Sequence, residues 1–183
     1  PESPGHEYRH PRAEDERFSR FSLISWWEQA RLRRARVLVV GAGALGNEIV
    51  KNCALVGIGN LLVADCDQVE NSNLSRSVLF REKDQGRDKA RVAQEAARDL
   101  YPDLKVQAFV GDAVHDLGWG AYLWADVILA GVDNREVRVA VNAGAAFARR
   151  TWIDGGIEVL NGVARVFDPH QGPCYECTMS EVD

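Results

Sequence analysis

The sequence predicts an α/β protein in which a mainly parallel sheet is flanked by helices on both faces. Short runs of apolar residues alternate along the chain with stretches of helical periodicity. A glycine-rich turn, GAGALG at 41–46, joins the first of these runs to a helical stretch. With 183 residues, the chain is long enough for one well-buried domain. Together these observations predict a Rossmann-like fold with an N-terminal helix in front of it.

The first elements follow from local patterns. An N-terminal helix is expected at 15–34, where large apolar side chains are candidate contacts at helical spacing. The run RVLVV at 36–40 predicts a strand buried on both faces. A helix should follow at about 44–57 and end at Gly57, and NLLVAD at 60–65 is the second expected strand.

The same alternation continues through the second half of the chain. Residues 87–100 show a clear amphipathic helical pattern, and 161–169 alternate as in a strand with one exposed face. The remaining expected elements are strands at 105–110, 125–131 and 151–155 and a helix at 134–149. Strands and helices that alternate in this way predict parallel pairing and one domain.

Composition and charge exclude several classes of function. Apolar residues make up 46% of the chain and charged residues 27%, which is ordinary for a globular protein. The net charge of −5 leaves no electrostatic footprint for nucleic acid, so no nucleic-acid partner is expected. No apolar run approaches the length of a membrane span, so no membrane contact is expected either.

The chain is expected to divide into a tail at 1–14 and one domain at 15–183. The tail is polar, contains proline and lacks the apolar core of a signal peptide, so we expect it to be loosely ordered. No internal repeat or linker interrupts the rest of the chain. Without an export signal, the protein is expected to be cytoplasmic and its four cysteines to be reduced.

The glycine turn predicts a nucleotide site. Gly41 permits the tight turn, Gly43 lets the backbone approach a phosphate, and Gly46 lets the helix pack on the strand. The amino end of the helix then presents unpaired N–H groups to an anion. Asp65, at the end of the second strand, can accept hydrogen bonds from ribose hydroxyls, or it can be an ordinary turn residue. Up to this point an NAD- or FAD-dependent oxidoreductase fits fully.

The segment after the second strand favours ATP instead. Residues 65–90 are polar and rich in charged side chains of both signs, and their Asn73, Arg76 and Lys89 could surround a triphosphate. A triphosphate carries about four negative charges and needs several cations or donors, usually with Mg²⁺. Asp133, after the fourth strand, could hold that Mg²⁺ or could cap the helix that begins near Asn134.

Four motifs in this order resemble the adenylating enzymes that activate ubiquitin-like proteins, the ThiF, MoeB and ubiquitin-activating-enzyme family. They are GAGALG at 41–46, DCDQVENSNLSR at 65–76, GRDKA at 86–90 and GVDNREVR at 131–138. A lone glycine motif is weak evidence, whereas the four together are specific. The resemblance covers roughly residues 16–180.

This resemblance implies a role for each matching residue. The three glycines would line the nucleotide, and Asp65 would bind the ribose. Asn73, Arg76 and Lys89 would contact the phosphates, and Asp133 would bind Mg²⁺. The RFSR segment at 17–20 resembles one that supplies an arginine finger to the partner subunit of a homodimer, which implies this role for Arg20, with Arg17 alongside.

The resemblance also implies an activity. The C-terminal glycine carboxylate of a ubiquitin-like or sulfur-carrier protein would attack the α-phosphate of ATP, releasing pyrophosphate and forming an acyl-adenylate. Three alternatives stay open: the oxidoreductase, a relative that activates a carboxylate on tRNA, and a scaffold that keeps the fold without catalysis. The acidic net charge argues against tRNA, and the retained phosphate ligands argue against a scaffold.

Cys174 and Cys177 form a CxxC pair near the end of the sequence. Two thiolates at this spacing can supply half of a tetrahedral zinc site, while a redox pair or two free thiols are the other interpretations. The family pattern places a second pair some tens of residues further on, and this sequence ends at Asp183. We therefore expect the domain to be incomplete at its C-terminus, and we assign no catalytic cysteine.

Overall fold

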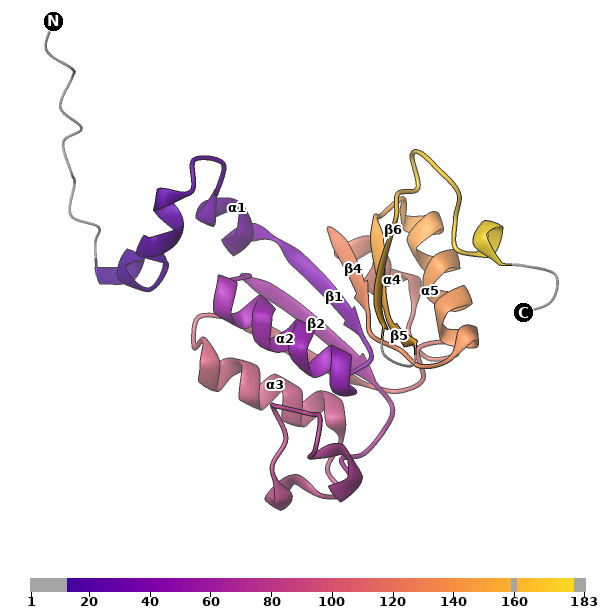
Figure 1. Ribbon diagram of the computed structural model, residues 1–183, viewed down its shortest axis with the longest axis horizontal. Helices are drawn as coiled ribbons and strands as arrows, with labels where there is room; N and C mark the ends of the chain where they lie inside the picture. The colour runs from indigo at the N-terminus through magenta and orange to yellow at the C-terminus, as the bar shows by residue number, and fades with distance from the viewer. Residues whose placement is uncertain (1–12, 159–160, 180–183) are drawn as a thin grey trace, which may run out of the picture.

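The computed structural model describes residues 13–158 and 161–179, and it contains one six-stranded sheet (Figure 1). The strand order is β3-β2-β1-β4-β5-β6. Neighbouring strands pair in parallel except β5 and β6, which pair in antiparallel fashion. The strands are β1 (Arg36–Val40), β2 (Asn60–Asp65), β3 (Lys105–Val110), β4 (Val127–Ala130), β5 (Trp152–Glu158) and β6 (Asn161–Phe167). The expected fold class, a mainly parallel sheet flanked by helices, is confirmed.

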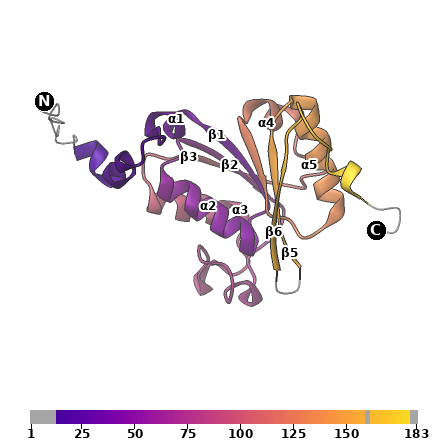
Figure 2. The ribbon, with the colours of Figure 1, turned by 45° about the horizontal axis from the view of Figure 1, so that its top comes forward.

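Helices cover both faces of the sheet (Figures 1 and 2). The long helices are α2 (Ala44–Val56), α3 (Lys89–Leu100) and α5 (Arg135–Ala148), and α4 (Trp119–Trp124) is short. Alternate residues of β1 enter two different cores: Val37 and Val39 pack with α2 and α3, whereas Leu38 and Val40 pack with α4 and α5. This double burial explains the continuous apolar run in β1.

Most elements lie where the sequence predicts them. β1, β2 and β3 have the expected bounds, and α2 ends at Gly57, which adopts a left-handed φ of 80°. The expected helix at 134–149 is α5, and the strand expected at 151–155 continues to residue 158. Helix α4 is not predicted, because its six residues are too few to show a period. None of the helices in the described part of the chain is long and apolar enough to cross a membrane.

The single N-terminal helix expected at 15–34 is wrong. The structure has a 3₁₀ segment, η1 (Ala13–Leu23), then a turn, and then the short helix α1 (Gln29–Arg34). Tertiary contacts fix this break: Phe18 packs edge-on against Tyr101, with ring centroids 5.6 Å apart, and the Gln29 amide donates to the Val56 carbonyl oxygen at 2.9 Å. Of the expected tail at 1–14, residues 1–12 lie outside the described residues.

Three short 3₁₀ turns complete the described structure. These are η2 (Asn71–Asn73), η3 (Glu82–Asp84) and η4 (Glu176–Thr178). The first two lie in the long connection between β2 and α3, which is the polar and charged segment of the sequence. This connection leaves β2 at its carboxyl end, which is where open parallel sheets bind their ligands.

Candidate functional site

A cavity of about 790 Å³ lies at the carboxyl ends of the parallel strands. Its volume falls in the range of small-molecule sites. It brings together most of the site residues expected from the sequence, and these are Gly41, Gly43, Asp65, Asn73, Arg76, Lys89 and Asp133. Gly46 is buried beneath the turn and does not line the cavity.

The glycine turn has the geometry that its sequence predicts. Gly41 has a φ of +90°, and a Cβ atom there would lie 2.6 Å from the carbonyl oxygen of Gly131. A Cβ atom on Gly46 would lie 1.9 Å from the carbonyl oxygen of Gly41, so only glycine lets α2 pack this closely. Gly43 has no atom within 4 Å of its Cβ position. Its lack of a side chain therefore leaves open space at the start of α2, where backbone N–H groups can meet an anion.

The backbone of Ala42, inside the turn, is held on both sides of its Cα atom. Its N–H donates to the Asp65 carboxylate at 2.6 Å, and its carbonyl oxygen accepts from the Asn47 amide at 2.7 Å. Asn47 is fully buried, and its Oδ1 accepts from the Leu79 N–H at 2.8 Å. Asn47 could not be singled out from the sequence, because α2 also contains the polar residues Glu48, Lys51 and Asn52, and only the packing of the helix buries Asn47.

Asp65 acts as a turn residue, which was one of the two roles expected for it. In addition to Ala42, its carboxylate accepts from the Asp67 N–H at 2.8 Å. Burial raises the pKa of Asp65, and the hydrogen bonds from Ala42 and Asp67 oppose that shift. The carboxylate faces the cavity, so a ribose contact stays a prediction beside the structural role.

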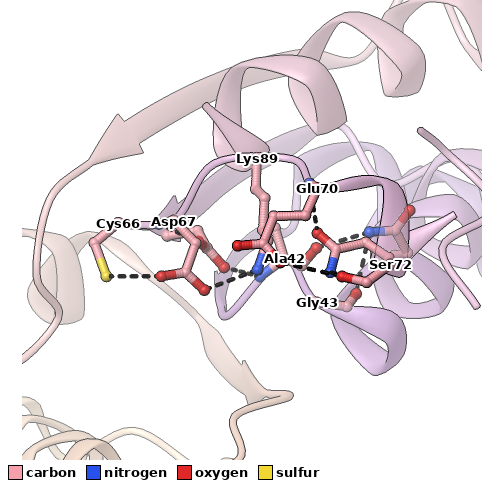
Figure 3. Close-up of polar contacts among 10 residues, drawn as sticks. Ala42, Gly43, Cys66, Asp67, Glu70, Ser72 and Lys89 are labelled. Atoms are coloured by element: carbon pink, nitrogen blue, oxygen red, sulfur yellow. Dashed lines mark hydrogen bonds and ion pairs between the residues drawn. The ribbon is translucent and has the colours of Figure 1, made fainter. Parts of the chain in front are cut away.

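Lys89 begins α3 and is paired with Asp67. The ammonium lies 2.8 Å from the Asp67 carboxylate; the lysine side chain is 12% exposed and that of Asp67 is 62% exposed. Figure 3 shows Lys89 and Asp67 close to Ala42, with Cys66 on the far side of Asp67. Asp67 could not be singled out from the sequence, because only the fold brings it to Lys89 from 22 residues away.

Asn73 and Arg76 lie in the connection that contains η2. The Asn73 side chain is buried, and its oxygen accepts from the Glu70 N–H at 3.0 Å, which closes this turn. Arg76 is exposed, and its guanidinium donates to the Ser72 carbonyl oxygen at 2.8 Å. Glu70 and Ser72 lie side by side in Figure 3. The amide thus shapes the segment, while most of the guanidinium remains available to an anion.

The alternative in which Asp133 caps α5 is wrong. The N-cap is Asn134, whose side chain accepts from the Val137 N–H at 2.9 Å. Asp133 is exposed at the cavity, and the hydrogen bonds and ion pairs of the described residues do not involve its carboxylate. A free carboxylate oxygen beside a phosphate site is the kind of ligand that Mg²⁺ takes, so the residues present fit this metal.

Arg20 is not brought to the cavity. It is exposed on η1, which precedes α1 and the start of β1, whereas the cavity lies at the other end of the strands (Figure 1). Arg17 instead binds within the chain: it donates to the Leu100 carbonyl oxygen at 2.6 Å and lies 5.0 Å from the centre of the Tyr101 ring. An arginine finger from Arg20 therefore requires a second copy of the chain, and it stays a prediction.

The two C-terminal cysteines lie together. The sulfur atoms of Cys174 and Cys177 are 3.4 Å apart, and hydrogen bonds from the Cys177 backbone and thiol lower the pKa of Cys174. In residues 13–158 and 161–179, no group of three or more potential ligands gathers around a metal position. The pair thus offers thiol ligands suited to zinc, but only half of a closed set.

Burial raises the pKa of Cys53 to about 12, as expected for a packed thiol.

Comparison with known proteins agrees with this geometry. The family profile described as the ThiF family matches residues 16–183. The chain belongs to the ThiF family. Within the family, it is 39% identical over 161 residues to human ubiquitin-like modifier-activating enzyme 7, covering 83% of this chain and 16% of that protein. It is 37% identical to the SAMP-activating enzyme E1 of Haloferax volcanii, covering 84% of this chain and 56% of that one.

Two further matches extend the comparison. The chain is 34% identical to the sulfur carrier protein adenylyltransferase of Thermus thermophilus, covering 81% of this chain and 57% of that protein. The crystal structure of E. coli MccB with MccA-N7isoASN superposes with a TM-score of 0.78 and 28% identity, covering 91% of this chain and 52% of that one. This ThiF-family chain thus spans little more than half the length, or less, of the relatives it matches.

Proposed function

We propose that this ThiF-family chain binds Mg·ATP and adenylates the C-terminal glycine carboxylate of a ubiquitin-like or sulfur-carrier protein. One observation carries the proposal: Arg76, Lys89 and Asp133 line the same cavity as the glycine turn. The names of the relatives, activating enzymes and an adenylyltransferase, support the same activity. A dinucleotide would use the turn and Asp65 but would leave those three charged side chains without a role, so we place the oxidoreductase second.

In the proposed reaction, an oxygen of the glycine carboxylate attacks the α-phosphorus of ATP. The bond from that phosphorus to the bridging oxygen breaks, and the electron pair leaves with pyrophosphate. The nucleophile is already an anion, so the reaction needs no general base. The work of the protein is to position the two reactants and to balance charge.

The cavity residues divide this work. The backbone at Gly41 and Gly43 would hold the nucleotide, and Asp65 would accept from the ribose. Arg76, Lys89 and the amide of Asn73 would contact the phosphates. Asp133 would ligate Mg²⁺, which supplies charge neutralisation when it is bound.

Three parts of the proposal concern the whole protein. Residues 15–183 would form the nucleotide-binding part of an adenylation domain. Arg20 would reach the cavity of a second copy in a homodimer. Cys174 and Cys177 would supply two thiolate ligands to zinc, and zinc content measured on the chain with and without the Cys174→Ser and Cys177→Ser changes tests that role.

Exchange of labelled pyrophosphate into ATP tests the activity. The chain is incubated with ATP, Mg²⁺, labelled pyrophosphate and a panel of small ubiquitin-like proteins that end in glycine. We expect exchange with at least one panel member, and loss of exchange when its terminal glycine is deleted. Exchange that does not depend on the terminal glycine would contradict adenylation of that carboxylate.

A further inference from the structure

A largely buried ion pair lies beside the loop that carries Asp133. Arg138 of α5 donates from Nε to the carboxylate of Asp154 on β5, at 2.8 Å. The side chains are 18% and 7% exposed, respectively. The guanidinium also donates from Nη2 to the carbonyl oxygen of Val132, at 2.7 Å. One side chain therefore ties helix α5, strand β5 and the backbone directly before Asp133 together.

The other hydrogen bonds that hold this loop are made by its backbone and by Asn134, so the orientation of Asp133 depends on the backbone around it. The Gly131 N–H donates to the carbonyl oxygen of Val40 at 2.9 Å, and Asn134 caps α5. The Asp133 side chain itself takes part in none of the hydrogen bonds found among the described residues. The direction of the Asp133 side chain is thus set by the peptide groups around it. Arg138 holds one of these, the peptide group that contains the Val132 carbonyl.

We infer that Arg138 is a positioning residue for the metal: held by Asp154, it fixes the Val132 peptide so that the Asp133 carboxylate faces the bound nucleotide. This inference rests on the proposed function, because it takes Asp133 as a ligand of Mg²⁺. A planar guanidinium suits the task, since it can bond a carboxylate and a carbonyl in fixed directions at once. A lysine keeps the charge next to Asp154 but has no such fork.

The test uses the ratio of ATP affinity with Mg²⁺ to ATP affinity in EDTA, measured by calorimetry on the full chain. Arg138→Lys keeps the buried carboxylate paired, so this variant is expected to fold. We expect it to lower the ratio at least about threefold while changing the affinity in EDTA less than about twofold. Asp154→Asn should reduce the ratio in the same way. Arg135→Lys, in the same helix but outside the cavity, is the matched control and should behave as the wild type.

A double variant separates positioning from other roles. If Arg138 acts through Asp133, Arg138→Lys should lower the ratio no further in an Asp133→Asn background. Equal weakening with and without Mg²⁺ would overturn the inference and show a structural role or a direct phosphate contact. An unchanged ratio in Arg138→Lys would also overturn it, leaving the proposed function intact. Absence of any Mg²⁺ effect in the wild type would overturn both, because Asp133 would then have no metal to hold.

Discussion

The glycine turn and the charged connection after β2 line the same cavity, yet they differ in how they are held. In the turn, the N–H and the carbonyl oxygen of Ala42 are both hydrogen-bonded, to the half-buried side chain of Asp65 and the buried side chain of Asn47, respectively. In the connection, Arg76 is exposed, and the guanidinium bond to Ser72 leaves most of its donors open to solvent. Lys89 is shielded but is paired with an exposed aspartate.

This difference indicates how binding energy would be divided. A turn fixed by buried hydrogen bonds is already in place when a nucleotide arrives, so it contributes shape with little ordering cost. Exposed charged side chains contribute attraction to phosphates but lose conformational freedom when they bind. The turn should therefore decide whether a nucleotide fits, and the connection should decide how many phosphates are preferred.

The largest effect should come from the turn and should distinguish two of its glycines. Gly46→Ala places a methyl group 1.9 Å from the carbonyl oxygen of Gly41, so we expect loss of a stable fold and of ATP binding. Gly43→Ala meets no atom within 4 Å, so the melting temperature should stay within about 2 °C while ATP affinity falls about tenfold. Thermal unfolding and calorimetry check both. Equal loss of stability in the two variants would show that Gly43 serves packing, not a ligand.

The next effect concerns the buried asparagine. Asn47→Ala removes the partner of the Ala42 carbonyl and of the Leu79 N–H, both in buried positions. Leaving such groups unpaired should lower the free energy of unfolding by about 1–3 kcal/mol, measured in urea. Asn60→Ala removes longer bonds at a half-buried site, to the carbonyl oxygens of Arg34 and Ala35, and should cost less. A smaller loss for Asn47 than for Asn60 would contradict the rigidity assigned to the turn.

Arg76 should affect affinity without affecting stability. Arg76→Ala removes a charge-assisted phosphate contact worth about 1.5–3 kcal/mol, so ATP should bind at least about tenfold more weakly. AMP affinity should change less, because the β- and γ-phosphates are absent. Lys83→Ala, an exposed lysine in the same connection, is the control. If AMP and ATP weakened equally, Arg76 would not be recognising the triphosphate.

The smallest effect is expected from the partner of Lys89. Asp67→Asn removes a carboxylate that neutralises the lysine, and because the aspartate is largely exposed to solvent the pair is worth only about 0.2–1 kcal/mol. We expect ATP affinity to rise by up to about threefold as Lys89 becomes more available. Lys89→Ala should instead weaken ATP, and in that background Asp67→Asn should add nothing. Weaker ATP binding in Asp67→Asn alone would mean that the aspartate orients the lysine rather than competing for it.

The sheet and the glycine turn could be predicted from local sequence patterns, because strand burial and glycine spacing depend on neighbours in the sequence. β1 and Gly46 could be predicted for this reason. The break in the segment at 15–34 could not, since it follows from the packing of Phe18 on Tyr101 and of Gln29 on the end of α2.

The site shows the same division. Residues at strand ends, such as Asp65 and Asp133, could be predicted to meet because parallel strands end at one edge of the sheet. Other features of the site depend on side-chain geometry that the sequence does not show. These are the helix cap at Asn134, the ion pair of Asp67 with Lys89 and the hydrogen bonds of Asn47. The sequence alone also left Asp133 with two roles, and the structure removes one of them.

The most direct test of the account is equilibrium binding of Mg·ATP and of NAD⁺ to this chain by calorimetry, with Arg76→Ala and Lys89→Ala as controls. We expect that Mg·ATP binds, that NAD⁺ does not, and that either substitution weakens the binding of Mg·ATP by roughly tenfold or more. Binding of NAD⁺ that neither substitution changes would contradict this expectation, because the glycine turn would then serve a dinucleotide and the charged connection would have no part in recognition.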